Sequence, residues 1–305
     1  MTQVGFWRDF KESNNRAILS GFGQMNQVHY LFPQGGGPRG SFATFTALKP
    51  HLKTRDLIIL SGVLREQAVC PVGVKDVTVL GACNELRQAT SDGVPNGGGA
   101  CWLAPTSPAA TTPLIRVIEQ GWSFENIQFA PVAASACITF DRRETAAIPD
   151  SSHGAVRNCY FTTGGASGFG VELIEVKKTV IEDCLFEALT GASGTAIKGT
   201  AGSGIAAKSH LLIRRNRFVL NINDIDIPST DYSLITQNVF FSTNPIEAGI
   251  RIKLSGSTGR NRVLLNQFSD VAADVTIAKG YTPGTNDVWN NYVAGTAALI
   301  VTVPT

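Results

Sequence analysis

Two acidic and two basic residues are the best candidates for chemistry in this 305-residue chain. Asp224 and Asp226 alternate with isoleucines, so on a strand both carboxylates would face the same side, about 6.6–7 Å apart. The acid and the base of inverting glycosidases lie about 6.5–9.5 Å apart, a range that includes this distance. Arg251 and Lys253 repeat the spacing further along the chain and could hold the carboxylate of an acidic sugar. These four residues predict, as one alternative, a polysaccharide hydrolase.

The same residues also fit a purely structural explanation. Charged residues of alternating sign recur about once per repeat, at Glu172, Lys198, Asp224, Arg251 and Asp274. On adjacent parallel strands such side chains would meet about 4.8 Å apart. Each exposed pair contributes at most about 1 kcal/mol. We therefore expect an outward charge ladder that favours the correct register, and we keep the hydrolase as the alternative.

A recurring aromatic residue marks the elements that would position these side chains. Short apolar strands end at Phe129, Phe161, Phe186, Phe218, Phe240, Phe268 and Tyr292. A second strand follows most of them, as where Ile250, Ile252 and Leu254 alternate with charged residues. No stretch offers the helix that a βαβ crossover needs. A loose period of this length predicts an all-β solenoid, a parallel β-helix.

Asparagine occupies the position two residues before the aromatic in the later repeats. These residues are Asn216, Asn238, Asn266 and Asn290, whereas the earlier repeats have Ile127, Cys159 and Cys184 there. At one inward corner of successive coils, the amides would lie about 4.8 Å apart and could bond one another. The sequence therefore predicts an asparagine ladder that continues a packed apolar corner, with Cys159 and Cys184 as stacked thiols.

The pattern resembles the pectate-lyase-like superfamily of right-handed parallel β-helices over roughly residues 57–303. The resemblance rests on Asn-Arg-Phe at 216–218, Asn-Val-Phe at 238–240, Asn-Gln-Phe at 266–268 and Asn-Asn-Tyr at 290–292, and on the strand-rich segments 56–66 and 77–81. It implies that residues 42–52 form a helix capping the open end. Residues 121–126 and 152–153 are similar to β-helix proteins of tailed bacteriophages. Arg251–Lys253 is similar to the Arg-Ile-Lys signature of polygalacturonases, whose Asn-Thr-Asp, Asp-Asp and Gly-His-Gly elements this sequence lacks.

Composition narrows the function classes. The formal net charge is only +2 and no basic cluster is present, so we expect no nucleic-acid partner. No run of 18 apolar residues predicts a membrane span, and the first residues do not read as a signal peptide. The four histidines are scattered and no Cys-x-x-Cys pair occurs, so we expect no metal site and no cofactor. Whether Cys83 and Cys101 form a disulfide stays open.

Two segments depart from the repeat. Residues 1–40 are expected to be a docking segment with Phe6, Trp7 and Phe10 as attachment residues, or else a segment that folds back over the end of the coil. The β-helix domain follows at 41–305. Residues 82–112 are expected to be a loop insertion, in which Trp102 is a candidate substrate-binding residue.

Taken with the phage resemblance, these features predict a non-catalytic virion structural protein, a spike, fibre or capsid-surface component. We expect it in the virion, made without a signal peptide, as a homo-oligomer with a trimer favoured. Its expected partners are other virion proteins, bound through the N-terminal segment, and host surface polysaccharide. The alternatives are the hydrolase with Asp224 and Asp226, and a carbohydrate-binding module that uses exposed aromatics such as Trp102 or Tyr160.

Overall fold

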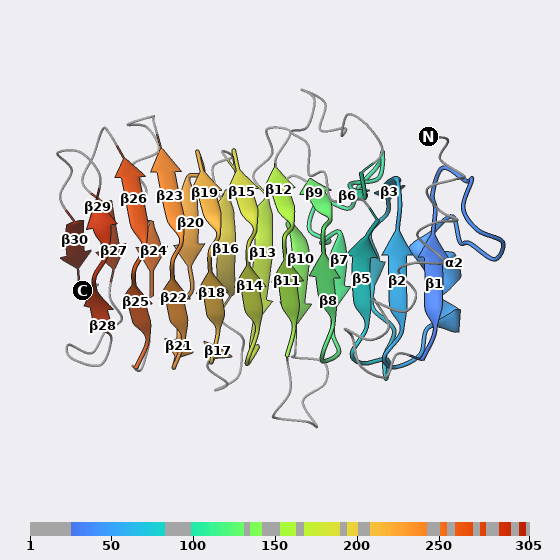
Figure 1. The fold of residues 1–305 in the computed structure, drawn as a ribbon, viewed down its shortest axis with the longest axis horizontal. Helices are drawn as coiled ribbons and strands as arrows, with labels where there is room; N and C mark the ends of the chain where they lie inside the picture. The colour runs from blue at the N-terminus through green and yellow to red at the C-terminus, as the bar shows by residue number, and fades with distance from the viewer. Residues whose placement is uncertain are drawn as a thin grey trace, which may run out of the picture.

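The chain forms the predicted right-handed parallel β-helix. The computed structural model describes residues 26–82, 99–130, 135–141, 153–162, 168–189, 194–200, 208–242, 251–254, 260–270, 275–278, 287–293 and 299–302. Every strand pairing among these residues is parallel, and three long sheets run along the solenoid. The three sheets are called A, B and C in the order in which the chain first enters them. Figure 1 shows sheets A and B as two rows along the long axis, with sheet C behind them.

Each sheet takes one strand from nearly every coil. Sheet A contains β1 (Val28–Leu31), β2 (Leu57–Leu60), β5 (Thr78–Gly81), β8 (Ser123–Glu125), β11 (Ala155–Arg157), β14 (Val180–Glu182), β18 (Leu212–Arg214), β22 (Leu234–Thr236), β25 (Arg262–Leu264) and β28 (Asp287–Trp289). Sheet B contains β3 (Val63–Arg65), β6 (Cys101–Leu103), β9 (Gln128–Ala130), β12 (Tyr160–Thr162), β15 (Leu185–Glu187), β19 (Arg217–Val219), β23 (Val239–Ser242), β26 (Gln267–Asp270) and β29 (Tyr292–Val293).

Sheet C completes the coil. It contains β4 (Ala68–Val69), β7 (Ile115–Val117), β10 (Ala136–Asp141), β13 (Phe169–Ile174), β16 (Thr195–Thr200), β20 (Asn223–Asp226), β24 (Ile252–Lys253), β27 (Val275–Ala278) and β30 (Leu299–Thr302). A small two-stranded sheet of β17 (Lys208–Ser209) and β21 (Thr230–Asp231) lies at the corner where the chain leaves sheet C for sheet A.

The turn from sheet A to sheet B is short. Two residues connect β8 to β9, and two residues connect each later strand of sheet A to the strand of sheet B that follows it. The first residue of this turn has a left-handed backbone in coil after coil, at Asn126, Asn158, Asp183, Arg215, Gln237, Leu265 and Asn290. Asparagine and aspartate tolerate this conformation better than most residues. The second residue points inward and builds the corner of the core.

A column of aromatic rings fills the interior beneath sheet B. From Phe129 to Phe268 neighbouring phenylalanines stack with centroids 4.7–5.2 Å apart. The register extends the column to Trp102 on one side of Phe129 and to Val293 beyond Phe268. Two predictions are corrected here: Tyr292 faces solvent, and Trp102 is a fully buried core residue rather than a ligand-binding one.

The asparagine ladder runs along the inner corner between sheets A and B. The Nδ2 of Asn216 donates to Oδ1 of Asn238, and that of Asn238 to Oδ1 of Asn266, both at 3.0 Å. The next amide is that of Asn291, which accepts from Asn266 at 3.0 Å. The prediction for Asn290 is wrong by one residue, because Asn290 takes the exposed left-handed position of the turn.

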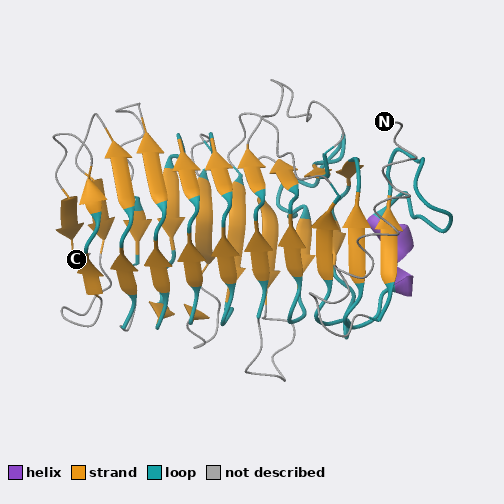
Figure 2. Ribbon diagram, viewed as in Figure 1, coloured by secondary structure: helices purple, strands orange, loops and turns teal. Residues whose placement is uncertain are grey.

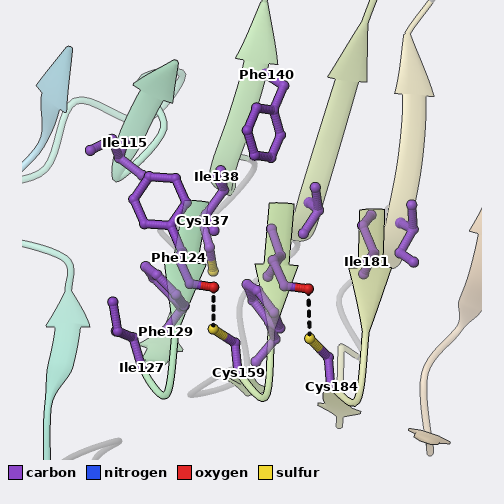
Figure 3. Packing of buried hydrophobic residues seen from close by; sticks show 14 of the residues in the cluster. Ile115, Phe124, Ile127, Phe129, Cys137, Ile138, Phe140, Cys159, Ile181 and Cys184 are labelled. Carbon is purple, nitrogen blue, oxygen red and sulfur yellow. Dashed lines mark hydrogen bonds between the residues drawn. The ribbon is translucent and has the colours of Figure 1, made fainter. Parts of the chain in front are cut away.

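Cysteines take the place of asparagine in the earlier coils. Cys159 Sγ lies 3.5 Å from the carbonyl oxygen of Phe124, and Cys184 Sγ lies 3.6 Å from that of Val156. Figure 3 shows both thiols pointing at the preceding coil. In the same way, Asn216 Nδ2 donates to the carbonyl of Ile181. A thiol and an amide therefore serve the same backbone acceptors at this corner.

The predicted capping helix is present as α2 (Phe45–Leu48) and the 3₁₀ turn Lys49–His51 at the end of the solenoid that carries β1 (Figure 2). Thr44 caps α2 through its side chain, and the ring centroids of Phe45 and Trp102 lie 5.5 Å apart.

The predicted boundary at residue 40 is too late, because β1 pairs with β2. None of the described helices is long and apolar enough to cross a membrane. Phe6, Trp7 and Phe10 lie outside the described residues.

Candidate functional site

The two candidate catalytic carboxylates do not face the same side. The register aligns Asp224 with Ala196, Gly170 and Cys137 on successive strands of sheet C. A Cβ on Gly170 would lie 2.8 Å from the Phe186 ring, so this row points into the solenoid. Asp226 lies in the outward row. The prediction of a paired acid and base on one surface is therefore contradicted.

Asp224 is part of a buried ion pair with Arg251. Its Oδ2 lies 3.3 Å from Arg251 Nη1, and its Oδ1 accepts a hydrogen bond of 3.0 Å from Asn221. Asp224 is 1 % exposed and Arg251 is 3 % exposed. Arg251 also donates to the carbonyl of Asn221. A carboxylate held this way cannot reach a glycosidic oxygen, and this arginine cannot reach a sugar.

The outward row of sheet C keeps the alternating charges that the sequence predicts, with a corrected membership. Glu172, Lys198, Asp226 and Lys253 lie opposite one another on four successive strands. Lys253 Nζ lies 3.8 Å from Asp226, and Lys198 Nζ lies 3.9 Å from the centroid of the Phe169 ring. Asp274 lies outside the described residues. Glu172 accepts hydrogen bonds from Thr139 and Thr200. Each of the four charges therefore has a partner within the protein, which suits a register ladder better than a site for a charged ligand.

Sheet A carries a second row of alternating charge that the sequence reasoning missed. Glu125, Arg157, Glu182 and Arg214 lie on successive strands. Glu182 accepts from Arg157 at 2.8 Å and from Arg214 at 2.6 Å. Burial alone would raise the pKa of Glu182, but these hydrogen bonds outweigh it and lower that pKa below its ordinary value. Counting charges two residues before each inner corner would have revealed the row.

A hollow of about 610 Å³ lies beside sheet A in the later coils. Its walls include Leu234 of β22, Arg262 of β25 and Asp287 of β28, together with His210, Tyr232 and Arg260 from the corner that precedes these strands. This volume is in the range of small-molecule and sugar pockets.

Three side chains from successive coils form a stack along one edge of this hollow. The His210 and Tyr232 rings are parallel within 8°, with centroids 5.2 Å apart. Arg260 Cζ lies 5.2 Å from the Tyr232 centroid, and its Nη1 donates to the Tyr232 hydroxyl at 2.8 Å. The neighbours on both sides fix the Tyr232 ring, which is 49 % exposed. The stack therefore directs the polar groups of His210, Tyr232 and Arg260 toward the hollow from fixed positions.

The inner side of the same corner explains why the stack is rigid. Ser233 Oγ accepts from the backbone of Leu211, and Asn261 Oδ1 accepts from the backbone of Ser233. Asn261 Nδ2 donates to the carbonyl of Thr230 at 2.7 Å. Each residue of the stack directly precedes one of these buried residues. The corner is therefore held on its outer side by the stack of His210, Tyr232 and Arg260, and on its inner side by the hydrogen bonds of Ser233 and Asn261. The sequence signal was present as His-Leu at 210–211, Tyr-Ser at 232–233 and Arg-Asn at 260–261, but it contains no repeated residue type.

The other candidate ligand-binding aromatic is also buried. Tyr160 is 3 % exposed, and its hydroxyl bonds to Glu187. Burial, together with this bond, raises the pKa of Tyr160 far above its ordinary value. The prediction of Tyr160 as an exposed sugar platform is therefore wrong. Cys101 is a buried thiol and not half of a disulfide, so the bridge to Cys83 that the sequence left open is not formed. Cys83 itself lies outside the described residues.

Residues 108–299 match the model of a family described as periplasmic copper-binding protein (NosD). None of the curated proteins is similar enough to match the chain. The fold and the family match together place the chain in the pectate-lyase-like β-helix superfamily, as its sequence predicted.

Several solved structures share the fold at low sequence identity. An alginate lyase from Paenibacillus sp. str. FPU-7 has a TM-score of 0.50 at 12 % identity, covering 90 % of this chain and 99 % of that one. A PL6 alginate lyase in complex with a trisaccharide has a TM-score of 0.55 at 14 % identity, covering 90 % of this chain and 56 % of that one. A tailspike protein of E. coli bacteriophage HK620 has a TM-score of 0.49 at 12 % identity, covering 96 % of this chain and 60 % of that one. These likenesses show the fold alone.

The family match corrects one prediction. Its description places the members in the periplasm. The sequence had led us to expect a virion protein made without a signal peptide, and that localisation is contradicted. Solved alginate lyases have the same β-helix fold, so a resemblance at the level of the fold does not determine the location of the protein.

Proposed function

The chain belongs to the NosD family, and for this member we propose a non-catalytic function, the binding of a carbohydrate in the hollow beside Tyr232. The observation that carries the proposal is the composition of that hollow, in which a fixed phenol and two guanidinium groups border the apolar side chain of Leu234. Sugars expose hydroxyl groups and apolar C–H faces together. A site with planar donors beside an apolar surface matches both.

The structure supports binding rather than cleavage. Asp224, the residue that would supply one half of a glycosidase pair, is buried against Arg251. At the hollow, Asp287 is the one carboxylate among the described lining residues, and it pairs with Arg262 at 3.6 Å. Hydrolysis by two carboxylates needs both to flank the scissile bond. The described walls of the hollow offer a single one.

The family description raises copper as a second ligand, and the described residues do not fit it. Among them, no three His, Cys, Asp or Glu side chains come close enough together to hold a metal ion. Burial raises the pKa of the Cys70, Cys137 and Cys184 thiols well above the ordinary value. A thiol binds metal as the thiolate, which these positions disfavour. We therefore assign the described part of the chain no copper site.

The experiment is direct binding of the purified protein to glycans. Affinity electrophoresis in gels containing polygalacturonate, alginate or dextran, followed by calorimetry with the matching oligosaccharides, should reveal at least one ligand. Arg262→Gln should weaken its binding. Arg217→Gln is the matched control, because Arg217 is also exposed but lies on sheet B. Failure of every glycan to bind, or equal losses in both variants, would overturn the proposal.

A further inference from the structure

The stack beside the hollow is part of a longer column, of three basic residues and one tyrosine, at one corner of the solenoid. Lys178, His210, Tyr232 and Arg260 each stand directly before a buried corner residue, and all four have a left-handed backbone with φ between 51° and 61°. The backbone N–H of Lys178 donates to Ser209, and that of His210 donates to Asp231. These bonds stack the corner residues coil on coil, so Lys178 extends the column beyond the hollow.

All four side chains of the column are exposed. Lys178 and Arg260 carry positive charge, His210 contributes its imidazole ring, and Arg262 adds another cation two residues after Arg260. Among the described residues that line the hollow, Asp287 is the acidic one. Asp287 is more than half exposed and lies 3.6 Å from Arg262. The corner therefore carries cations spaced along the solenoid axis, with Tyr232 as a fixed spacer between His210 and Arg260.

Geometry sets the kind of ligand that such a column fits. Neighbouring coils lie about 4.8 Å apart, so three coil steps place Lys178 about 14 Å from Arg260 along the axis. A small anion would contact one end only. A polymer with a carboxylate on each sugar presents charge along its whole length and can run parallel to the axis. Guanidinium groups match carboxylates through paired N–H donors.

We infer that this corner binds an extended acidic oligosaccharide lying along the solenoid axis, with Arg260 and Arg262 holding one end and Lys178 the other. The inference rests on the proposed carbohydrate-binding function and adds the ligand's charge, its minimum length and its direction. The face concerned is the corner beside sheet A, on a different side of the coil from the outward charge row of sheet C. None of the predicted site residues belongs to it.

The test is a length series of oligogalacturonates, from disaccharide to hexasaccharide, titrated calorimetrically into the wild type and three variants. Arg262→Gln should weaken every length about two- to fivefold, the range for one exposed ion pair. Lys178→Gln should weaken the pentamer and hexamer by a similar factor and leave the disaccharide unchanged. Arg217→Gln should change neither. Raising the salt concentration should weaken the long oligomers more than the short ones.

The outcomes separate this inference from the function on which it rests. The inference is supported if the affinity of the wild type rises with oligomer length and Lys178→Gln abolishes that rise. The axial acidic site would be overturned if neutral malto-oligosaccharides bound as tightly as the acidic series, or if Lys178→Gln did not change the affinity for long oligomers. Carbohydrate binding itself would then still stand. No binding of any oligosaccharide would overturn both.

Discussion

Arg251 Nη1 lies 3.3 Å from Asp224 Oδ2, and both side chains are inside the solenoid. The pair lies at the same corner as Asn221, whose amide bonds to Asp224 and to the carbonyl of Phe186. Charges in such a place have lost their hydration and depend on each other. The pair therefore fixes how the coil of β20 sits on the coil of β24.

Asp224→Ala should destabilise the protein by about 3–5 kcal/mol, because it leaves the Arg251 guanidinium buried without its partner. The double variant Asp224→Leu/Arg251→Met should recover most of that loss. Denaturant midpoints followed by circular dichroism measure both. Asp226→Ala is the matched control: its partner Lys253 is 40 % exposed, so the loss should stay below about 1 kcal/mol. Similar losses for Asp224→Ala and Asp226→Ala would contradict the interior placement.

Asn238→Ala should cost far more than Asn290→Ala, although the two residues stand in similar sequence contexts. Asn238 accepts from the backbone and the side chain of Asn216 and donates to Ile213 and Asn266. Each buried group left without a partner costs about 1–3 kcal/mol. Asn290 faces solvent in a left-handed turn, where alanine costs about 1 kcal/mol. Thermal midpoints of the two variants give the comparison, and Asn291→Ala should behave as a weaker Asn238→Ala because Asn291 is less buried.

The error at Asn290 shows what sequence periodicity can and cannot provide. The repeat predicted the solenoid, the inward corner and the ladder because each follows from spacing. Asn290-Asn291-Tyr292 fits the motif in two registers, and the structure chooses the one that puts Val293 inside. The sequence favoured the aromatic for the core, but packing at this coil uses the valine and leaves Tyr292 outside.

The candidate site was harder to predict than the fold. Strict alternation made Asp224 and Asp226 neighbours on one face, but in β10, β13, β16 and β20 two consecutive residues near the start of the strand, such as Ala196 and Ile197, are both buried. That break in alternation turns Asp224 inward. The hollow beside Tyr232 escaped notice because its column combines a lysine, a histidine, a tyrosine and an arginine, and only the coil register brings them together.

Phe186→Ala should destabilise the protein by about 3–5 kcal/mol, since it opens a cavity in the middle of a ring stack. Phe186 lies 4.7 Å from the Phe161 centroid and 5.1 Å from that of Phe218. Phe186→Leu should cost less, because it keeps most of the buried volume. Phe241→Ala is the control, being an outward phenylalanine of β23 that is 38 % exposed. Urea midpoints should rank the three variants in that order, with Phe241→Ala the mildest.

Glu182 predicts how stability depends on pH. Its pKa in the folded state is lowered, because hydrogen bonds from Arg157 and Arg214 outweigh the effect of burial. A carboxyl whose pKa is lower in the folded state contributes stability above its unfolded pKa of about 4.3, and loses it as the pH falls toward the folded value. Asp183, whose pKa is lowered by Arg215, adds to the same trend. The protein should therefore lose this part of its stability as the pH falls below about 4.3.

Glu182→Gln isolates this contribution, because the amide keeps the shape of the side chain and does not titrate. Thermal midpoints between pH 7 and pH 3 should fall less in the variant than in the wild type, and the two curves should converge at the acidic end. At neutral pH the variant should be the less stable protein, since Arg157 and Arg214 lose their shared carboxylate. Glu187→Gln serves as the comparison, because Glu187 bonds to the Tyr160 hydroxyl instead of an arginine. Parallel curves for wild type and Glu182→Gln would show that the arginine row of sheet A does not hold this carboxylate in its charged form.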